Sequence, residues 1–391
     1  MKSRIPHVII KRRALAIALL GVLWAAFSAS AQSAGSARKP AIGPGKVIIQ
    51  TPSGADISGY DVDPNGTEGL VTEGVLLNDG RYDFAVATFD QRTGKIIKVE
   101  AEQKNILGDF ITLGVFGNST GLAEYEHVSR LFVNKRIYGV INPLDGNKLT
   151  GSWTPPLQAD DIIYEVGRAL GFPDAAFLYF ENNDQDETSL VFSSNVGANT
   201  FGPVIDLNDQ VFARYNSPVM AYDGGTNQAV VAASPGCPKC GNTVALVDLA
   251  TGVISEFPGL GLGFVNGIAV DPNTGIACTS TEIDFSVEFY NLATQTGIIV
   301  RLPGATNQAQ SGLDVEVDPI HKLFLVGQEV SSTAPSGSSI QVFDEQGNFV
   351  ESLNGFGLPA TPVYMALHPS ERAGYVYNQV DSRAVVQSFT Y

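Results

Sequence analysis

The chain repeats one pattern of hydrophobic and polar positions: an apolar run ends in a small, polar or charged residue, a turn follows, and a second apolar run begins. The clearest copies are residues 60–71, 219–231, 268–277, 315–325 and 365–376. Their turns carry Asp63, Asp223, Asp271, Asp318 and His368. The last four turns are 48, 47 and 50 residues apart, a spacing typical of one supersecondary unit repeated along the chain. Asp223 lies 160 positions after Asp63, which leaves room for three units, so we expect two degenerate copies between them.

A second pattern lies in the other half of each unit, where an apolar residue precedes Asp or Asn, a short turn and another apolar run. The instances are Phe89-Asp90, Ile141-Asn142, Ile205-Asp206, Val247-Asp248, Tyr290-Asn291 and Phe343-Asp344. An Asp or Asn at the first turn position caps the backbone, and a following Gly such as Gly252 or Gly347 supplies the positive φ that closes a hairpin. Because the two patterns alternate, each unit is expected to hold four short strands.

Repeated units of four strands predict an all-β fold, a β-propeller. We predict seven four-stranded blades, with six as the alternative because residues 104–216 are the least regular. The last unit begins at Val363 and stops after its third strand. Residues 46–51 supply the missing strand, so the ring is expected to close by pairing of this N-terminal strand with the last blade, which removes an exposed edge. Residues 46–391 then form a single domain.

Two of the units carry recognisable motifs, Asn266-Gly267-Ile268-Ala269-Val270-Asp271-Pro272 and Gly312-Leu313-Asp314-Val315-Glu316-Val317-Asp318-Pro319. These repeats resemble those of secreted bacterial propellers of YVTN/NHL type. They are also distantly similar to the Asn-Gly-(Leu/Ile)-Ala strands of the SMP-30/gluconolactonase family. The resemblance implies a propeller over residues 46–391, and propellers of this kind serve many unrelated functions.

The first 31 residues have the order of a secretory signal peptide. The basic residues Lys11-Arg12-Arg13 precede residues 14–27, which lack charge, and Ala29 and Ala31 stand at −3 and −1 of a cut before Gln32. Fourteen residues span about 21 Å as a helix, less than the roughly 30 Å of a bilayer core, so a membrane anchor is the weaker interpretation. Residues 32–45 are expected to be a flexible leader. The predicted location is the bacterial periplasm or the medium.

Charge narrows the choice of partners. The chain has 24 Lys and Arg against 40 Asp and Glu, a net charge of −16. Residues 1–31 contain five of the basic residues and no acidic one, so the remainder carries −21. This argues against nucleic acid or an anionic membrane as the main partner. A monomer without a membrane span after cleavage is expected.

Cys237-Pro238-Lys239-Cys240 is the sharpest short motif. A zinc site would need four ligands, and Cys278 is the one further cysteine, with no His clustered near. A redox pair would need a helix start, which a loop between strands does not supply. For an exported protein we therefore favour a Cys237–Cys240 disulfide, with metal and redox roles as alternatives. Cys278 lies in an apolar strand and is expected to be buried.

Other candidate residues are sparse. His321 and His368 sit at turns, where exposure is expected, whereas Glu124 and His127 lie in a small polar cluster able to bind a cation or move a proton. A polar surface is the favoured interpretation of that cluster. The acidic run of residues 181–187, which contains Asp184 and Asp186, offers hard oxygens to Ca²⁺, although a solvated loop is favoured there too.

The lactonase resemblance also implies a site. Ligands of that family bind in the central channel on one divalent ion held by Glu, Asn and Asp. Asn266 matches the Asn of the family's Asn-Gly strand entrance, and Asp314 occupies a comparable entrance one blade later, in the order Gly-Leu-Asp. The resemblance therefore implies Asn266 and Asp314 as binding or metal-ligating residues.

These features support two main hypotheses. The favoured one is a non-catalytic binding or scaffold propeller that presents loops to a protein or glycan partner. The alternative is a metal-dependent lactonase or esterase acting on a small molecule at the channel mouth, with Asn266 and Asp314 as ligands, Glu124 or His127 as base, and Ca²⁺ or another divalent cation as cofactor. A propeller-type lyase or cofactor-dependent dehydrogenase is a third.

Overall fold

The structure is a computed structural model of the 391-residue chain. It describes residues 43–51, 55–77, 81–106, 110–116, 119–129, 132–141, 151–157, 161–183, 186–207, 215–235, 241–262, 265–281, 285–305, 312–328, 338–356, 364–380 and 383–391. The predicted signal segment, Asp184 and the Cys237–Cys240 pair lie outside the described residues, so these three predictions stay predictions. Within the described residues no helix combines the length and the apolar character needed to cross a membrane.

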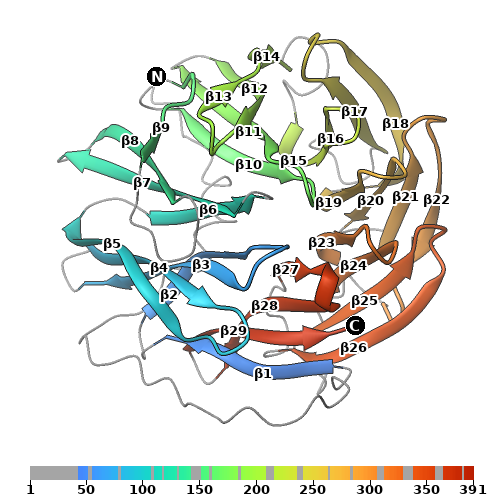
Figure 1. The fold of residues 1–391 in the computed structure, drawn as a ribbon. Helices are drawn as coiled ribbons and strands as arrows, with labels where there is room; N and C mark the ends of the chain where they lie inside the picture. The colour runs from blue at the N-terminus through green and yellow to red at the C-terminus, as the bar shows by residue number, and fades with distance from the viewer. Residues whose placement is uncertain are drawn as a thin grey trace, which may run out of the picture.

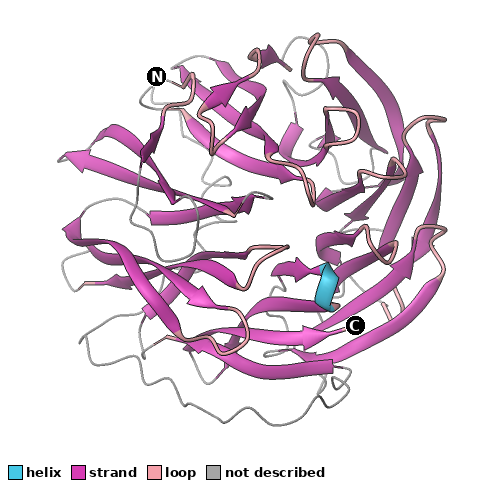
Figure 2. Cartoon of the chain, in the orientation of Figure 1, coloured by secondary structure: helices cyan, strands magenta, loops and turns pink. Residues whose placement is uncertain are grey.

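The described residues form seven antiparallel sheets arranged around a central axis (Figures 1 and 2). The first sheet has β2 (Ala55–Val62), β3 (Glu68–Leu76), β4 (Tyr82–Asp90) and β5 (Ile96–Ile106). The second has β6 (Phe110–Phe116), β7 (Thr120–Ser129), β8 (Phe132–Ile141) and β9 (Gly151–Trp153). The third has β10 (Ile162–Arg168), β11 (Asp174–Asn183), β12 (Asp186–Asn195), β13 (Thr200–Phe201) and β14 (Ile205–Asp206). The fourth has β15 (Tyr215–Asp223), β16 (Gln228–Pro235), β17 (Gly241–Asp248) and β18 (Ile254–Leu262).

The remaining three sheets complete the ring. The fifth has β19 (Val265–Asp271), β20 (Ile276–Thr281), β21 (Ser286–Asn291) and β22 (Thr296–Arg301). The sixth has β23 (Gly312–Asp318), β24 (Leu323–Gln328), β25 (Ser338–Asp344) and β26 (Phe349–Phe356). The seventh has β27 (Tyr364–His368), a 3-10 turn (Pro369–Glu371), β28 (Ala373–Val380), β29 (Arg383–Thr390) and, from the other end of the chain, β1 (Gly43–Gln50). The all-β propeller is thereby confirmed.

The ring closes where the two ends of the chain meet. Strand β1 pairs antiparallel with β29, with Gly43 opposite Thr390 and Gln50 opposite Val385. This is the closure that the sequence predicts. The strand order of this sheet is β1-β29-β28-β27, so β1 covers the edge that β29 would otherwise expose.

Each sheet begins with an inner strand that faces the axis. The inner strands β2, β6, β10, β15, β19, β23 and β27 follow one another around the ring, each beside the next (Figure 1). Apolar side chains on both faces of every sheet pack against the two neighbouring sheets and form the core, as Leu70, Phe84 and Val86 of the first sheet do against Val115 and Ala123 of the second. The core is thus divided into layers between adjacent sheets.

The turn after each inner strand, here called the inner turn, follows the predicted chemistry in four sheets. The carboxylate Oδ1 of a buried aspartate accepts a backbone N–H two residues further along. The pairs are Asp63 with Asn65 at 2.9 Å, Asp223 with Gly225 at 2.9 Å, Asp271 with Asn273 at 2.8 Å and Asp318 with Ile320 at 2.9 Å. In the turn between the third and fourth strands, here called the outer turn, Oδ1 of Asp248 and Asp344 also accepts the N–H two residues further along. Oδ1 of Asp90 and Asn291 accepts the N–H three residues further along.

Two predictions about turns were wrong. His368 is buried at 4% exposure because its Nε2 lies 2.7 Å from the carbonyl oxygen of Gly66, which joins the last sheet to the first. Ile205-Asp206 is not an outer turn: it forms the short strand β14 beside β12, and the outer turn of that sheet begins at Asn195, whose Oδ1 accepts the N–H of Ala198. His321 is exposed, as expected, and Cys278 is fully buried, as expected.

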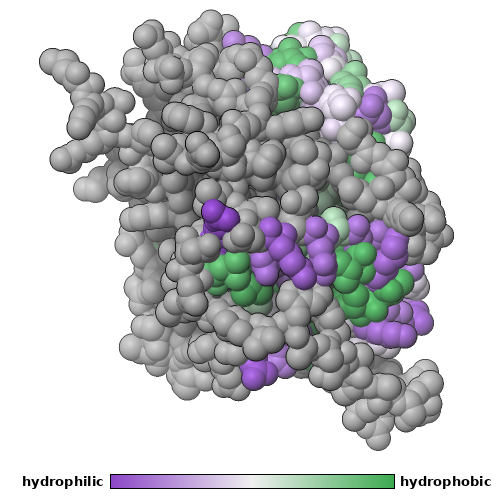
Figure 3. All heavy atoms as spheres, turned by 90° about the vertical axis from the view of Figure 1, so that its left-hand side faces the viewer, coloured by the Kyte–Doolittle hydropathy of each residue, from purple (hydrophilic) through white to green (hydrophobic). Residues whose placement is uncertain are grey.

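The outer edge of the first sheet is protected by charge. On β5 the apolar side chains of Ile97 and Val99 are exposed, and Lys98 between them forms an ion pair with Glu100 at 2.8 Å. Figure 3 shows the side of the ring nearest β5, where apolar areas of the described surface are bordered by hydrophilic residues. Charged residues on an edge strand disfavour pairing with another chain.

A glycine substitution tests the closure of the ring. Gly94 in the first outer turn has φ +68°, and a Cβ placed on it would lie 1.7 Å from the carbonyl oxygen of Ile48 on β1. We expect Gly94→Ala to lower the free energy of unfolding by about 2–4 kcal/mol, since it adds a clash to the left-handed strain. The control Gly275→Ala has φ +65° and open space, so about 1 kcal/mol is expected. Urea denaturation measures both, and equal losses would show that contact with β1 is unimportant.

Candidate functional site

The inner strands enclose a cavity of about 120 Å³ near the points where the inner turns begin. Most of the residues that line it have apolar side chains, among them Val62, Val115 and Ile268 from three different inner strands. Three charged residues also line it: Arg168 at the end of β10, Asp174 at the start of β11 and Glu316 in the middle of β23. Arg168 and Glu316 belong to the charged constellation described next.

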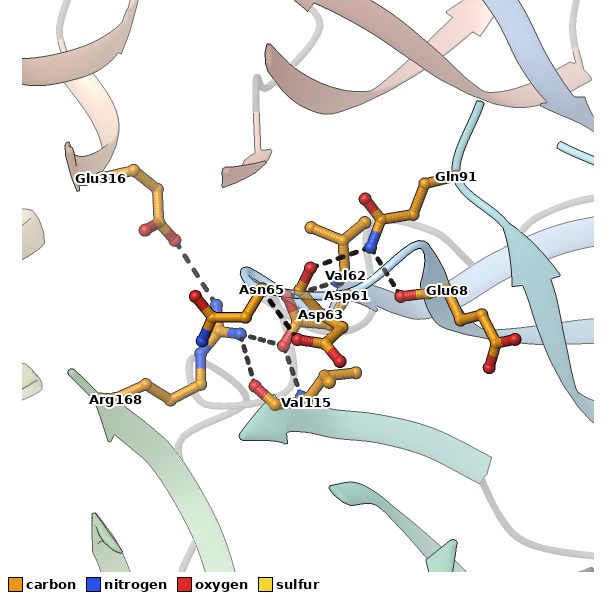
Figure 4. A network of polar contacts seen from close by, with 9 residues as sticks. All are labelled: Asp61, Val62, Asp63, Asn65, Glu68, Gln91, Val115, Arg168 and Glu316. Atoms are coloured by element: carbon orange, nitrogen blue, oxygen red, sulfur yellow. Dashed lines mark hydrogen bonds and ion pairs between the residues drawn. The ribbon is translucent and has the colours of Figure 1, made fainter. Parts of the chain in front are cut away.

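Arg168 joins three sheets across the channel (Figure 4). Its Nη1 donates to Oδ2 of Asp61 on β2 and to the carbonyl oxygen of Val115 on β6, the latter at 3.2 Å. Its Nη2 lies 3.7 Å from Oε1 of Glu316 on β23. The Arg168 side chain is 28% exposed and that of Asp61 is 5% exposed, so solvent screens this charge pair only partly.

Asp61 also bonds to the backbone on both sides. Its Oδ1 accepts the N–H of Val62 at 2.8 Å, and its Oδ2 accepts the N–H of Val115 on the next inner strand at 2.6 Å. With Arg168 as a further donor, both oxygens of this buried carboxylate are satisfied. Asp61 therefore links the first and second sheets as well as neutralising Arg168.

Glu316 differs from Asp61 in its surroundings. Burial raises its pKa from 4.5 to about 8, although Arg168 opposes the shift and the charges of Asp314 and Asp61 add to it. Below pH 8 Glu316 is therefore mostly protonated, while Arg168 and Asp61 neutralise each other. Glu316 is 26% exposed, so it is a group in this constellation that can exchange a proton near neutral pH.

The two residues implied by the lactonase resemblance lie on the neighbouring inner strands β19 and β23, and each has a different partner. Asn266 Nδ2 donates to the carbonyl oxygen of Gly312 at 2.9 Å, which links β19 to β23. Asp314 Oδ2 accepts the N–H of Met365 at 2.7 Å, which links β23 to β27. Each side chain thus bonds to the following inner strand. Burial raises the pKa of Asp314 to about 6, against the lowering effect of its backbone hydrogen bonds to Met365 and Val315.

The other predicted site residues lie away from the cavity wall or beyond what is described. Glu124 is buried within β7, the second strand of its sheet, and is not part of the wall. His127 ends up on the same strand, opposite Lys135, and Asp186 opens β12 opposite Asn183; the structure does not describe the side chains of either residue. Among the described residues no group of three or more His, Cys, Asp or Glu is arranged to hold a metal ion.

Sequence reasoning missed the constellation around Arg168. Arg168 lies in the irregular region, where the inner turn has no Asp-Pro signature, so its strand could not be aligned with the other inner strands. Asp61 and Glu316 did carry a pattern: each stands between apolar residues on an inner strand, with Asp61 two positions before the turn aspartate Asp63 and Glu316 two before Asp318. A charged residue two positions before the turn aspartate of an inner strand is the pattern that could have identified them.

Comparisons with known proteins show the fold alone. No family model matches the chain, and a comparison with curated protein sequences gives no match. Among solved structures, the chain is similar to Raptor from Chaetomium thermophilum, with a TM-score of 0.57 and 10% sequence identity over 90% of this chain. The match covers 29% of the Raptor chain, so the present chain spans less than a third of that protein. The class that fold and comparison define is a β-propeller.

Removal of Arg168 tests the charged constellation. Arg168→Met leaves the carboxylate of Asp61 buried without its counter-ion, so we expect the free energy of unfolding to fall by about 3–5 kcal/mol. Arg92→Met is the control because Arg92 pairs with Glu371 at 2.6 Å on the exposed surface, where solvent screens the pair. Urea denaturation of both variants at pH 7 is the measurement, and a similar small change in the two would contradict a structural role for Arg168.

Glu316 gives a prediction about pH. The pKa of Glu316 in the folded protein, about 8, exceeds its ordinary value of 4.5. The contribution of the protonated Glu316 to the free energy of unfolding is therefore full below pH 4.5 and is lost as the pH rises to 8. Glu316→Gln cannot ionise, so we expect this variant to gain on the order of 2 kcal/mol over the wild type between pH 5 and 8. Urea midpoints at pH 5, 6.5 and 8 measure the difference. The exposed control Glu102→Gln should follow the wild type, and an unchanged pH slope in Glu316→Gln would refute the assignment.

Proposed function

We propose that this chain is an exported, seven-bladed β-propeller that acts as a non-catalytic binding or scaffold module and presents its loops to a protein or glycan partner. The observation that carries the proposal is that the polar side chains of the channel are engaged in hydrogen bonds within the ring. Arg168, Asp61, Asp314 and Asn266 all bond to one another or to the backbone of neighbouring inner strands. These bonds hold the ring together, which favours binding through the surface over chemistry in the channel.

The size of the cavity supports the same conclusion. It measures about 120 Å³, whereas sites for small molecules are roughly 300–1,000 Å³. The cavity is therefore smaller than the usual site for a small molecule, whereas binding of a protein or glycan at the surface of the propeller needs no enclosed cavity.

The sequence supports the remaining parts of the proposal. The basic and apolar N-terminal segment with Ala29 and Ala31 before Gln32 indicates export to the periplasm or the medium. In that setting Cys237 and Cys240 form a disulfide, and the mature chain is a monomer whose negative charge favours partners other than nucleic acid. The repeat motifs favour a YVTN/NHL-type propeller over the SMP-30/gluconolactonase family, because the Asn266 and Asp314 side chains bond to separate inner strands.

The proposal is tested by assaying chemistry and binding on the same purified protein. We expect no turnover of simple lactones and esters with CaCl₂ or with EDTA. We also expect saturable binding to a member of a panel of glycans and envelope proteins, measured by biolayer interferometry. Lactone or ester hydrolysis that is lost in Asn266→Ala and in Asp314→Asn would overturn the proposal in favour of the metal-dependent hydrolase.

A further inference from the structure

The inner turns of four sheets provide an internal comparison. Asp63, Asp223, Asp271 and Asp318 are each at most 3% exposed, and each uses Oδ1 to cap its own turn. The hydrogen-bond partner of the second oxygen, Oδ2, differs from sheet to sheet. We therefore compare the four turns by the group that donates to Oδ2.

Three of the four second oxygens have a hydrogen-bond donor. Asp63 Oδ2 accepts from the hydroxyl of Ser119, and Asp223 Oδ2 accepts from Thr226 Oγ1 at 2.7 Å. Asp318 Oδ2 lies 2.7 Å from Nδ1 of His321 and accepts from the Tyr391 hydroxyl at 3.0 Å. Asp271 Oδ2 is buried and has no hydrogen-bond donor among the described residues.

The donor that Asp271 lacks has been diverted to a second carboxyl group. Thr274 occupies the position that Thr226 occupies in the preceding sheet, three residues after the turn aspartate. Its Oγ1 donates instead to Oε1 of Glu345 at 2.7 Å. Glu345 comes from the outer turn of the next sheet, and its carboxyl group lies within hydrogen-bonding reach of the carboxyl group of Asp271.

Other sheets of the ring have no carboxylate at the position of Glu345. Glu345 directly follows the outer-turn residue Asp344, and the equivalent residues of the fourth, fifth and first sheets are Leu249, Leu292 and Gln91. Leu249 and Leu292 are buried there, as Glu345 is. An acidic side chain in an apolar position, close to a second buried carboxyl group, is unfavourable unless a proton or a metal cation lies between them. Burial and the neighbouring Glu345 raise the pKa of Asp271 to about 6, so the proton is mostly lost at pH 7.5. Lys322 Nζ is 3.7 Å from Glu345 Oε2, but its side chain is 61% exposed, so its charge is screened.

We propose that Asp271, Glu345 and Thr274 form a binding site for a hard divalent cation of the Ca²⁺ class at the junction of the β19–β22 and β23–β26 sheets. The carboxylate oxygens and the threonine hydroxyl are the hard ligands that Ca²⁺ prefers, and its loose geometry accepts water for the remaining positions. Asn273 is exposed and Thr274 is half-buried, so the turn that holds the site borders solvent. The ion links two sheets on the turn face, in place of the protein donors that serve Asp63, Asp223 and Asp318.

The test compares Ca²⁺ binding in the wild type and in matched variants. At pH 7.5 we expect millimolar CaCl₂ to raise the Tm of the wild type by about 2–4 °C over EDTA, and Tb³⁺ luminescence to report the site directly. Glu345→Gln and Asp271→Asn should lose both responses. Glu345→Gln should fold normally, since Gln91 occupies the same place in the first sheet.

Two controls place the ion. Asp223→Asn alters the equivalent turn aspartate of the preceding sheet, which has Thr226 as its donor. Asn266→Ala alters a residue of the channel. Both variants should keep the Ca²⁺ response of the wild type. Retention of the full response in Glu345→Gln would overturn the site, as would its loss in Asp223→Asn. The proposal would also be overturned if the Tm of the wild type did not respond to Ca²⁺ and Glu345→Gln raised it. That result would show that a proton joins the carboxyl groups of Asp271 and Glu345.

Discussion

The close approach of neighbouring inner strands is the constraint on which the rest of the structure depends. A Cβ placed on Gly59 would lie 2.9 Å from the backbone of Thr112 on the next inner strand, and a Cβ on Gly167 would lie 2.8 Å from that of Ala221. The strands can therefore pack backbone against backbone around the axis. This brings charged side chains from sheets far apart in sequence within reach of one another, and a cavity of about 120 Å³ lies between the inner strands.

Much of the acidity of the chain serves these junctions. Asp61, Asp314 and the turn aspartates accept backbone N–H groups, and several of them bond to the next sheet. A carboxylate used in this way keeps its charge, but its position is explained by hydrogen bonding within the ring and does not by itself indicate a cationic partner. The net charge of −16 is consequently weak evidence about what the protein binds, although it still disfavours nucleic acid.

Local chemistry could be predicted from the sequence, whereas contacts between sheets could not. The Asp-capped turns and the pairing of β1 with β29 follow from residues close together or at the chain ends. His368 was misjudged because its partner, Gly66, lies in the first sheet, 302 positions away. Arg168 was missed for the same reason, since its partners Asp61 and Glu316 lie 107 and 148 positions away and its own repeat is degenerate.

A repeat protein supplies its own reference state, and departures from that reference are informative. Where the repeat calls for a turn aspartate, His368 replaces it and bonds to Gly66, so the departure is explained by the junction between the last and first sheets. Where the repeat calls for a buried leucine, Glu345 replaces it, and Oδ2 of the neighbouring Asp271 has no hydrogen-bond partner among the described residues. The first substitution completes a hydrogen bond; the second creates a need for one more positive charge. That difference separates a structural variation of the repeat from a binding site.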